Sequence, residues 1–90
     1  MKADKNPAIR EALLQVVENQ LKSLDPPETK ETYDRLLSEG YSEDETRSFL
    51  AAAILYEMNT ILRKREPFDR QRFAARLHGL PDSLEQEEDD

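Results

Sequence analysis

One acidic side chain, Glu57, follows the longest apolar stretch of the chain. The residues from Phe49 to Tyr56 are all apolar, and Glu57 comes directly after them. On a helical wheel at 100° per residue, Glu57 falls between Ala53 and Ile61, inside a broad apolar arc. A buried carboxylate needs a partner, because an isolated charge is costly to remove from water. Glu57 is therefore either the acid of a polar site inside a helical core or a structural group that fixes helix register or chain pairing.

Two polar residues near the N-terminus are candidate partners for this acid. Gln20 projects between Ile9 and Leu13 on a helical wheel, and Arg10 lies at the edge of the same apolar stripe. A tyrosine hydroxyl is a third candidate. A single acid without a second carboxylate or a histidine forms neither a dimetal site nor an acid/base pair. We therefore expect Glu57, Gln20 and Arg10 to be buried polar residues with a structural role, with no catalytic residue, metal or cofactor.

Basic side chains form a second group that could do chemistry. They lie across one short stretch of sequence: Arg63, Lys64, Arg65, Arg70, Arg72 and Arg76. A basic cluster of this kind can contact the phosphates of a nucleic acid. Glu66 and Asp69 interrupt it, however, so we expect a solvated surface and keep a nucleic-acid accessory role as an alternative. The only histidine, His78, lies where a helix is expected to end, and its charged form suits that position better than a metal-ligand role.

Composition limits the other possibilities. The 90 residues contain no cysteine and two glycines, which excludes disulfides, thiolate metal sites and a glycine-rich phosphate loop. The net charge is −7, but six of the 20 acids lie in the last nine residues, so residues 1–81 carry 14 acids against 13 bases. We predict one helical domain over residues 1–81 and a disordered acidic tail over residues 82–90.

No segment of the sequence predicts a membrane or export role. The N-terminus lacks the apolar core of a signal peptide. The longest apolar run has eight residues, whereas spanning a bilayer takes about 20. We therefore expect no membrane association and a cytoplasmic location.

Helix start and stop signals divide the chain into four helices. Asn6 precedes Pro7 as a cap, and Asp25 is placed to cap a second helix that Gly40 ends. Ser42 and Glu45 form a capping box. They open a long third helix that runs from about residue 43 to residue 65.

The fourth helix is expected to begin at Asp69 and to close at Gly79. Phe68 and Phe73 are spaced as a hydrophobic staple around the Asp69 cap. No strand pattern is present. The predicted fold is all-α, a compact antiparallel bundle of four helices with one long central helix.

The third helix is apolar in most directions, which is typical of a helix that is central in its domain or shared with a second chain. Its second apolar region contains Ala51, Leu55 and Leu62, with Tyr41 nearby. We expect these four residues to form an interaction surface. The sequence therefore predicts a non-enzymatic helical module that contacts protein partners, first of all a second copy of itself. A small metal- or acid-dependent site around Glu57 is a further alternative.

Three segments also resemble a small bacterial family of all-helical proteins of unknown function. They are NPAIREALLQVVENQL, DPPETKETYDRLLSEGYSEDE and EPFDRQRFAARLHGLP, and together they cover most of the chain. Many members of that family carry histidines at the positions of Arg10, Leu14, Asp44 and Ser48, where two pairs one helical turn apart would suit a metal. This chain lacks all four. The resemblance therefore implies the helical scaffold and the acid at Glu57, without that metal site and without an assigned activity.

Overall fold

The computed structural model describes residues 7–87, with side chains over residues 7–84. Four α-helices follow one another, namely α1 (Pro7–Ser23), α2 (Pro27–Ser38), α3 (Glu43–Lys64) and α4 (Arg70–His78), and a short 3-10 helix, η2, spans Asp82–Glu87. Residues 7–87 contain no strand. The prediction of an all-α fold of four helices is confirmed.

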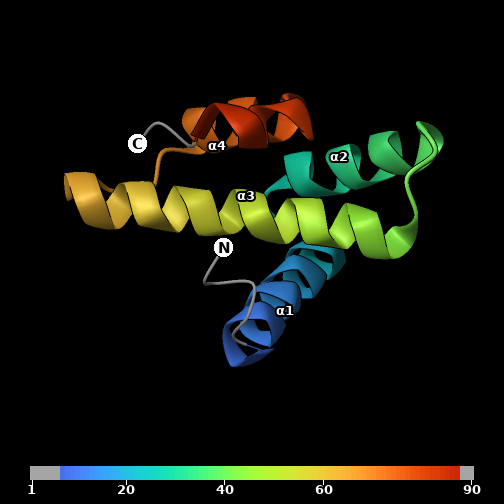
Figure 1. Ribbon diagram of the computed structural model, residues 1–90, viewed down its shortest axis with the longest axis horizontal. Coiled ribbons are helices and arrows are strands. Elements are labelled where there is room, and N and C mark those ends of the chain that lie inside the picture. Colours follow the sequence, from blue (N-terminus) through green and yellow to red (C-terminus); the bar gives the residue numbers. More distant parts are fainter. Residues whose placement is uncertain (1–6, 88–90) are drawn as a thin grey trace.

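Helix α3 is the central element of the fold. It contacts α1, α2, α4 and η2, and the longest dimension of the molecule, 34 Å, is about the length of a 22-residue helix at 1.5 Å per residue. Figure 1 shows α2 and α4 on one side of α3 and α1 on the other side. Helix α1 runs obliquely, so the arrangement is not a regular antiparallel bundle. As a consequence, α1 covers only part of the length of α3.

The hydrophobic core lies on both sides of α3. Helix α1 contributes Leu13 and Val17, and α2 contributes Leu36. The other members come from α3 and from the chain after it: Leu50, Ala51, Ala53, Ile54, Phe73, Leu77 and Leu80. Along α3 buried residues recur every three or four positions, which is the spacing of one helix face: Thr46, Leu50, Ala53, Glu57 and Thr60.

The junction between α2 and α3 has the predicted stop and start signals. Gly40 adopts a φ of 105°, a conformation that favours glycine. The amide of Tyr41 donates to the carbonyl of Leu36 at 3.2 Å, which closes the end of α2. The Ser42 hydroxyl accepts from the Glu45 amide at 3.0 Å, and the Glu45 carboxylate accepts from the Ser42 amide at 2.9 Å. The capping box is confirmed.

The start of α4 also follows the prediction. The Asp69 carboxylate accepts a hydrogen bond of 3.0 Å from the Arg72 amide. The ring centroids of Phe68 and Phe73 lie 5.8 Å apart, one on each side of this cap. Cap and staple together fix the direction in which α4 leaves the connection from α3.

Two helix caps were predicted for α1 and α2, and neither is confirmed. The predicted Asp25 cap of α2 is wrong, because Pro26 is the N-cap residue and no side chain bonds to the free amides. Proline at the first helical position removes one of those amides and so lowers the need for a side-chain cap. The predicted Asn6 cap of α1 lies outside the described residues.

The C-terminal boundary lies further along the chain than predicted. Leu80 is buried in the core, and Leu84 packs against it after Pro81. The Ser83 hydroxyl donates to the carbonyl of Arg76 at 2.7 Å, and a Cβ at Gly79 would lie only 2.9 Å from the Ser83 Cβ. Residues 82–84 therefore pack on the domain beyond its predicted end at residue 81, and residues 88–90 lie outside the described part.

Arg35 of α2 holds the end of α4. One guanidinium nitrogen donates to the carbonyl oxygens of Leu77 at 3.2 Å, His78 at 3.4 Å and Leu80 at 3.1 Å. The other terminal nitrogen donates to the Glu39 carboxylate at 3.0 Å. The carbonyls of Leu77 and His78 belong to the last turn of α4, where a cation is favoured by the helix dipole, and that of Leu80 lies just after it. Arg35 therefore links α2 to the C-terminal end of α4.

Replacing Arg35 with glutamine is expected to lower the free energy of unfolding by about 1.5 kcal/mol, because hydrogen bonds from a charged donor contribute more than neutral ones. Urea titration followed by circular dichroism measures this loss. Glu39→Gln is the matched control, since it removes only the exposed ion pair of Arg35, and we expect a change below about 0.5 kcal/mol. Equal losses in the two variants would contradict the role assigned to the carbonyl contacts.

Candidate functional site

Glu57 is buried, with 3% of its surface exposed, and it is held by two arginines of α4. Arg72 Nε donates to Glu57 Oε1 at 3.0 Å, and Arg72 Nη2 donates to Oε2 at 2.7 Å. Arg76, which is also buried, places Nη2 at 3.7 Å from Oε1. The prediction that Glu57 is buried is confirmed. Its carboxylate faces two guanidinium groups.

Arg72 extends this ion-pair network toward the surface. Its Nη1 donates to Glu66 Oε1 at 3.1 Å and lies 4.0 Å from Asp69 Oδ2. The hydrogen bond to Glu57 is the main cause that raises the pKa of the Arg72 guanidinium above its ordinary value, while desolvation acts in the opposite direction. Both oxygens of Glu57 accept hydrogen bonds from Arg72, whose side chain, like that of any arginine, is charged at physiological pH. This arrangement suits a structural anchor between α3 and α4 better than a general base.

The predicted partners of Glu57 are wrong. Gln20 is half-buried, and its Oε1 accepts from the buried hydroxyl of Thr29 at 2.7 Å, so it joins α1 to α2. Arg10 is exposed rather than buried, and its Nη2 donates to Ser48 Oγ at 2.9 Å. Helix α1 and helix α4 lie on opposite sides of α3 (Figure 1), so the polar side chains of α1 do not reach the face that carries Glu57.

The six members of the basic cluster lie in two places, three on α4 and three at the end of α3. Arg72 and Arg76 face Glu57, and Arg70 Nη2 lies 3.5 Å from Glu28 Oε1. The other three, Arg63, Lys64 and Arg65, are exposed at the C-terminal end of α3. The cluster is therefore not one continuous phosphate-contacting surface, because half of it serves to fix α4.

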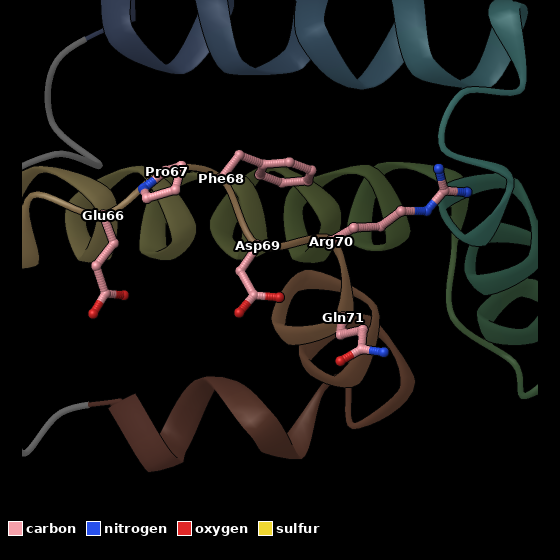
Figure 2. A pocket seen from close by; sticks show the side chains of 6 residues that line it. All are labelled: Glu66, Pro67, Phe68, Asp69, Arg70 and Gln71. Atoms are coloured by element: carbon pink, nitrogen blue, oxygen red, sulfur yellow. The ribbon is translucent and has the colours of Figure 1, made fainter.

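The connection from α3 to α4 forms an open, shallow hollow lined by residues 66–71. Figure 2 shows the Glu66 and Asp69 carboxylates on one side of this connection and the Phe68 ring on the other side. Arg70 extends away from the hollow toward the start of α2. Because these acids already lie beside Arg72, the hollow offers no free set of acid and base groups.

The predicted interaction surface is divided by α1. Ala51 is only 4% exposed and belongs to the core, so its assignment to a surface is wrong. Tyr41 is half-buried, and its ring meets the Phe49 ring edge-on at 5.2 Å between centroids. Leu55 is half-buried, and Leu62 is 73% exposed. The exposed part of the surface therefore lies toward the C-terminal end of α3.

Met58, which directly follows the buried Glu57, belongs to this exposed part. It is 46% exposed and lies three residues after Leu55 and four before Leu62, which puts the three side chains on one helix face. We call Leu55, Met58 and Leu62 the α3 face. A helical wheel gives the direction of each side chain but not where a crossing neighbour ends, so the exposure of Met58 could not be read from the spacing.

Neither a metal site nor a membrane span is found in residues 7–87. No group of three or more acidic or histidine side chains in this part converges in a way that could hold a metal ion. None of its helices has both the length and the apolar character that crossing a bilayer requires. Comparisons of the chain with protein-family models, with curated proteins and with solved structures found no match.

Proposed function

We propose that this protein is a non-enzymatic helical interaction module that self-associates through the α3 face. The observation that carries the proposal is the change of exposure along one side of α3. That side is buried at Ala51, where 4% of the residue is exposed, and it is open at Met58 and Leu62, where 46% and 73% are exposed.

The change of exposure follows from the position of α1. Arg47 donates to the Glu18 carboxylate at 2.8 Å, and Arg10 donates to Ser48 at 2.9 Å, so α1 is held against the N-terminal half of α3. The α3 face continues the α1-facing side beyond this contact. Burying a leucine or methionine side chain contributes about 1.5–3 kcal/mol, and a contiguous apolar strip on a helix is a common docking surface for another helix.

A second copy of the chain suits this face because Leu55, Met58 and Leu62 carry no charge. In a two-fold symmetric pair the same residues meet from both sides, and no charged group has to be buried between them. The cations Arg63 and Lys64 directly follow Leu62 in the sequence. If the two α3 helices pair antiparallel, the basic ends point in opposite directions and do not repel one another.

Three side chains on each partner make a small interface, so we expect a weak dimer. Specific stable interfaces bury roughly 800 Å² per partner, and the apolar stems of neighbouring arginines and lysines would have to supply part of that area. We expect association in the micromolar range, and we place the module in the cytoplasm.

Leu62→Glu is expected to weaken the dimer by at least about tenfold in dissociation constant, because it puts a charge into the apolar contact. Sedimentation equilibrium over a concentration series measures this change. Leu24→Glu is the matched control: Leu24 is 55% exposed, lies between α1 and α2, and receives the same substitution outside the α3 face. A wild-type protein that stays monomeric at high micromolar concentration, or equal effects of the two substitutions, would contradict the proposal.

A further inference from the structure

The centre of the α3 face is a methionine, and methionine is chemically different from the leucines beside it. Met58 is 46% exposed. The chain has two methionines, and of these Met58 lies within the described residues 7–87. Its thioether sulfur is a nucleophile that peroxides oxidise. The chain contains no cysteine, so no thiol within the protein competes for the oxidant.

We infer that Met58 is a redox-sensitive site whose oxidation by hydrogen peroxide dissociates the self-associated form. The reaction is a two-electron oxygen transfer. The sulfur lone pair attacks one peroxide oxygen, the O–O bond breaks, an S–O bond forms, and the second oxygen leaves as water after proton transfer. The sulfur is oxidised to the sulfoxide, and the peroxide is reduced.

The physical consequence arises at the middle of the contact. A sulfoxide oxygen is a strong hydrogen-bond acceptor, whereas Leu55 and Leu62 on either side offer no donor. Burying an acceptor without a donor opposes association, and the sulfoxide also removes the flexible apolar group that methionine provides at a contact. We expect the dissociation constant of the dimer to rise by at least about tenfold. This inference rests on the self-association proposed above.

Burial of the sulfur gives a second consequence, a change of oxidation rate that is specific to a sulfur inside the contact. If association covers the sulfur, the dimer reacts more slowly than the monomer, and oxidation traps the monomer. The fraction of Met58 oxidised after a fixed time in excess hydrogen peroxide is therefore expected to fall as the protein concentration rises. A sulfur on an unrelated surface would react equally at all protein concentrations.

The test compares wild type with Met58→Leu, each with and without hydrogen peroxide. Peptide mapping by mass spectrometry measures the oxidised fraction at Met58, and sedimentation equilibrium measures the dissociation constant before and after treatment. Each variant is its own reference, so oxidation of Met1 affects both in the same way. We expect the constant to rise at least about tenfold in wild type and to stay unchanged by peroxide in Met58→Leu. Treatment of the oxidised wild type with methionine sulfoxide reductases is expected to restore association.

The outcomes separate this inference from the proposed function. A wild-type dimer that keeps its dissociation constant after complete oxidation of Met58 overturns the inference and leaves self-association standing. An oxidation rate that does not depend on protein concentration, in a protein that dimerises, places the sulfur outside the contact and also overturns it. A wild-type protein that is monomeric before oxidation overturns the proposed function and, with it, the redox control.

Discussion

Replacing Glu57 with leucine is expected to lower the free energy of unfolding by about 4 kcal/mol, because removing one member of a buried ion pair leaves the other charge in a poorly solvated place. The buried member that remains is Arg76, which is 7% exposed and has Nη2 at 3.7 Å from Glu57 Oε1. The partly exposed Arg72 can turn toward water. Thermal and urea unfolding followed by circular dichroism measure the loss.

A double-mutant cycle distinguishes a lost ion pair from a poorly packed leucine. Glu57→Leu combined with Arg76→Leu removes both buried charges, and an apolar pair is often as stable as the ion pair it replaces. We therefore expect the double variant to be more stable than Glu57→Leu alone. Glu66→Gln is the control, since Glu66 is an exposed partner of Arg72. A loss in Glu57→Leu no larger than in Glu66→Gln would mean that the carboxylate is not part of the core.

The local chemistry of the sequence predicted the helix ends because each end depends on residues within one turn. The Ser42–Glu45 capping box, the Asp69 cap and the positive φ of Gly40 follow from side chains and amides that are close in sequence. The prediction that Asp25 caps α2 was wrong for an equally local reason. The two prolines after it, Pro26 and Pro27, shift the start of α2 by one residue.

The partners of Glu57 depend on how helices far apart in the sequence pack together. The wheel identified Glu57 as buried because burial depends on the face of its own helix. It did not identify Arg72 and Arg76, which come from a helix that begins 13 residues later at Arg70. Their spacing of four residues was a usable signal, because it places both on one face of α4 and two cations on one face suit a buried acid.

The course of α1 likewise explains the errors on α3. Ala51 and Leu62 share one helix face by spacing, yet the first is buried and the second is 73% exposed. What separates them is the oblique path of α1 (Figure 1), which ends its cover partway along α3. That path depends on contacts between helices, such as Arg47 with Glu18 and Gln20 with Thr29. The periodicity of a single helix does not predict which residues of other helices it will contact.

Ending the chain after Pro81 is expected to lower the free energy of unfolding by about 3 kcal/mol, from the lost burial of apolar surface and from lost hydrogen bonds. The shortened chain lacks Leu84, which packs on the core, and the Ser83 hydroxyl that donates to the Arg76 carbonyl at 2.7 Å. It also uncovers Leu80, which is otherwise 3% exposed. The midpoint of thermal unfolding would fall by about 4–8 °C for each kcal/mol in a domain of this size.

Ending the chain after Glu87 is the matched control, because it keeps η2 and every contact named above while it removes three acids. If the acidic C-terminus acts only through its charge, the two truncations change the unfolding free energy in proportion to the six and three acids that they remove, and both changes respond to salt. If η2 is part of the fold, only the shorter chain is destabilised, and added salt does not restore it because the lost contacts are apolar and hydrogen-bonded rather than ionic. Leu84→Asp in the full chain separates the effect of lost Leu84 packing from the effect of a shorter chain. It keeps all 90 residues, removes the apolar side chain, and is expected to reproduce most of the loss seen after truncation at Pro81.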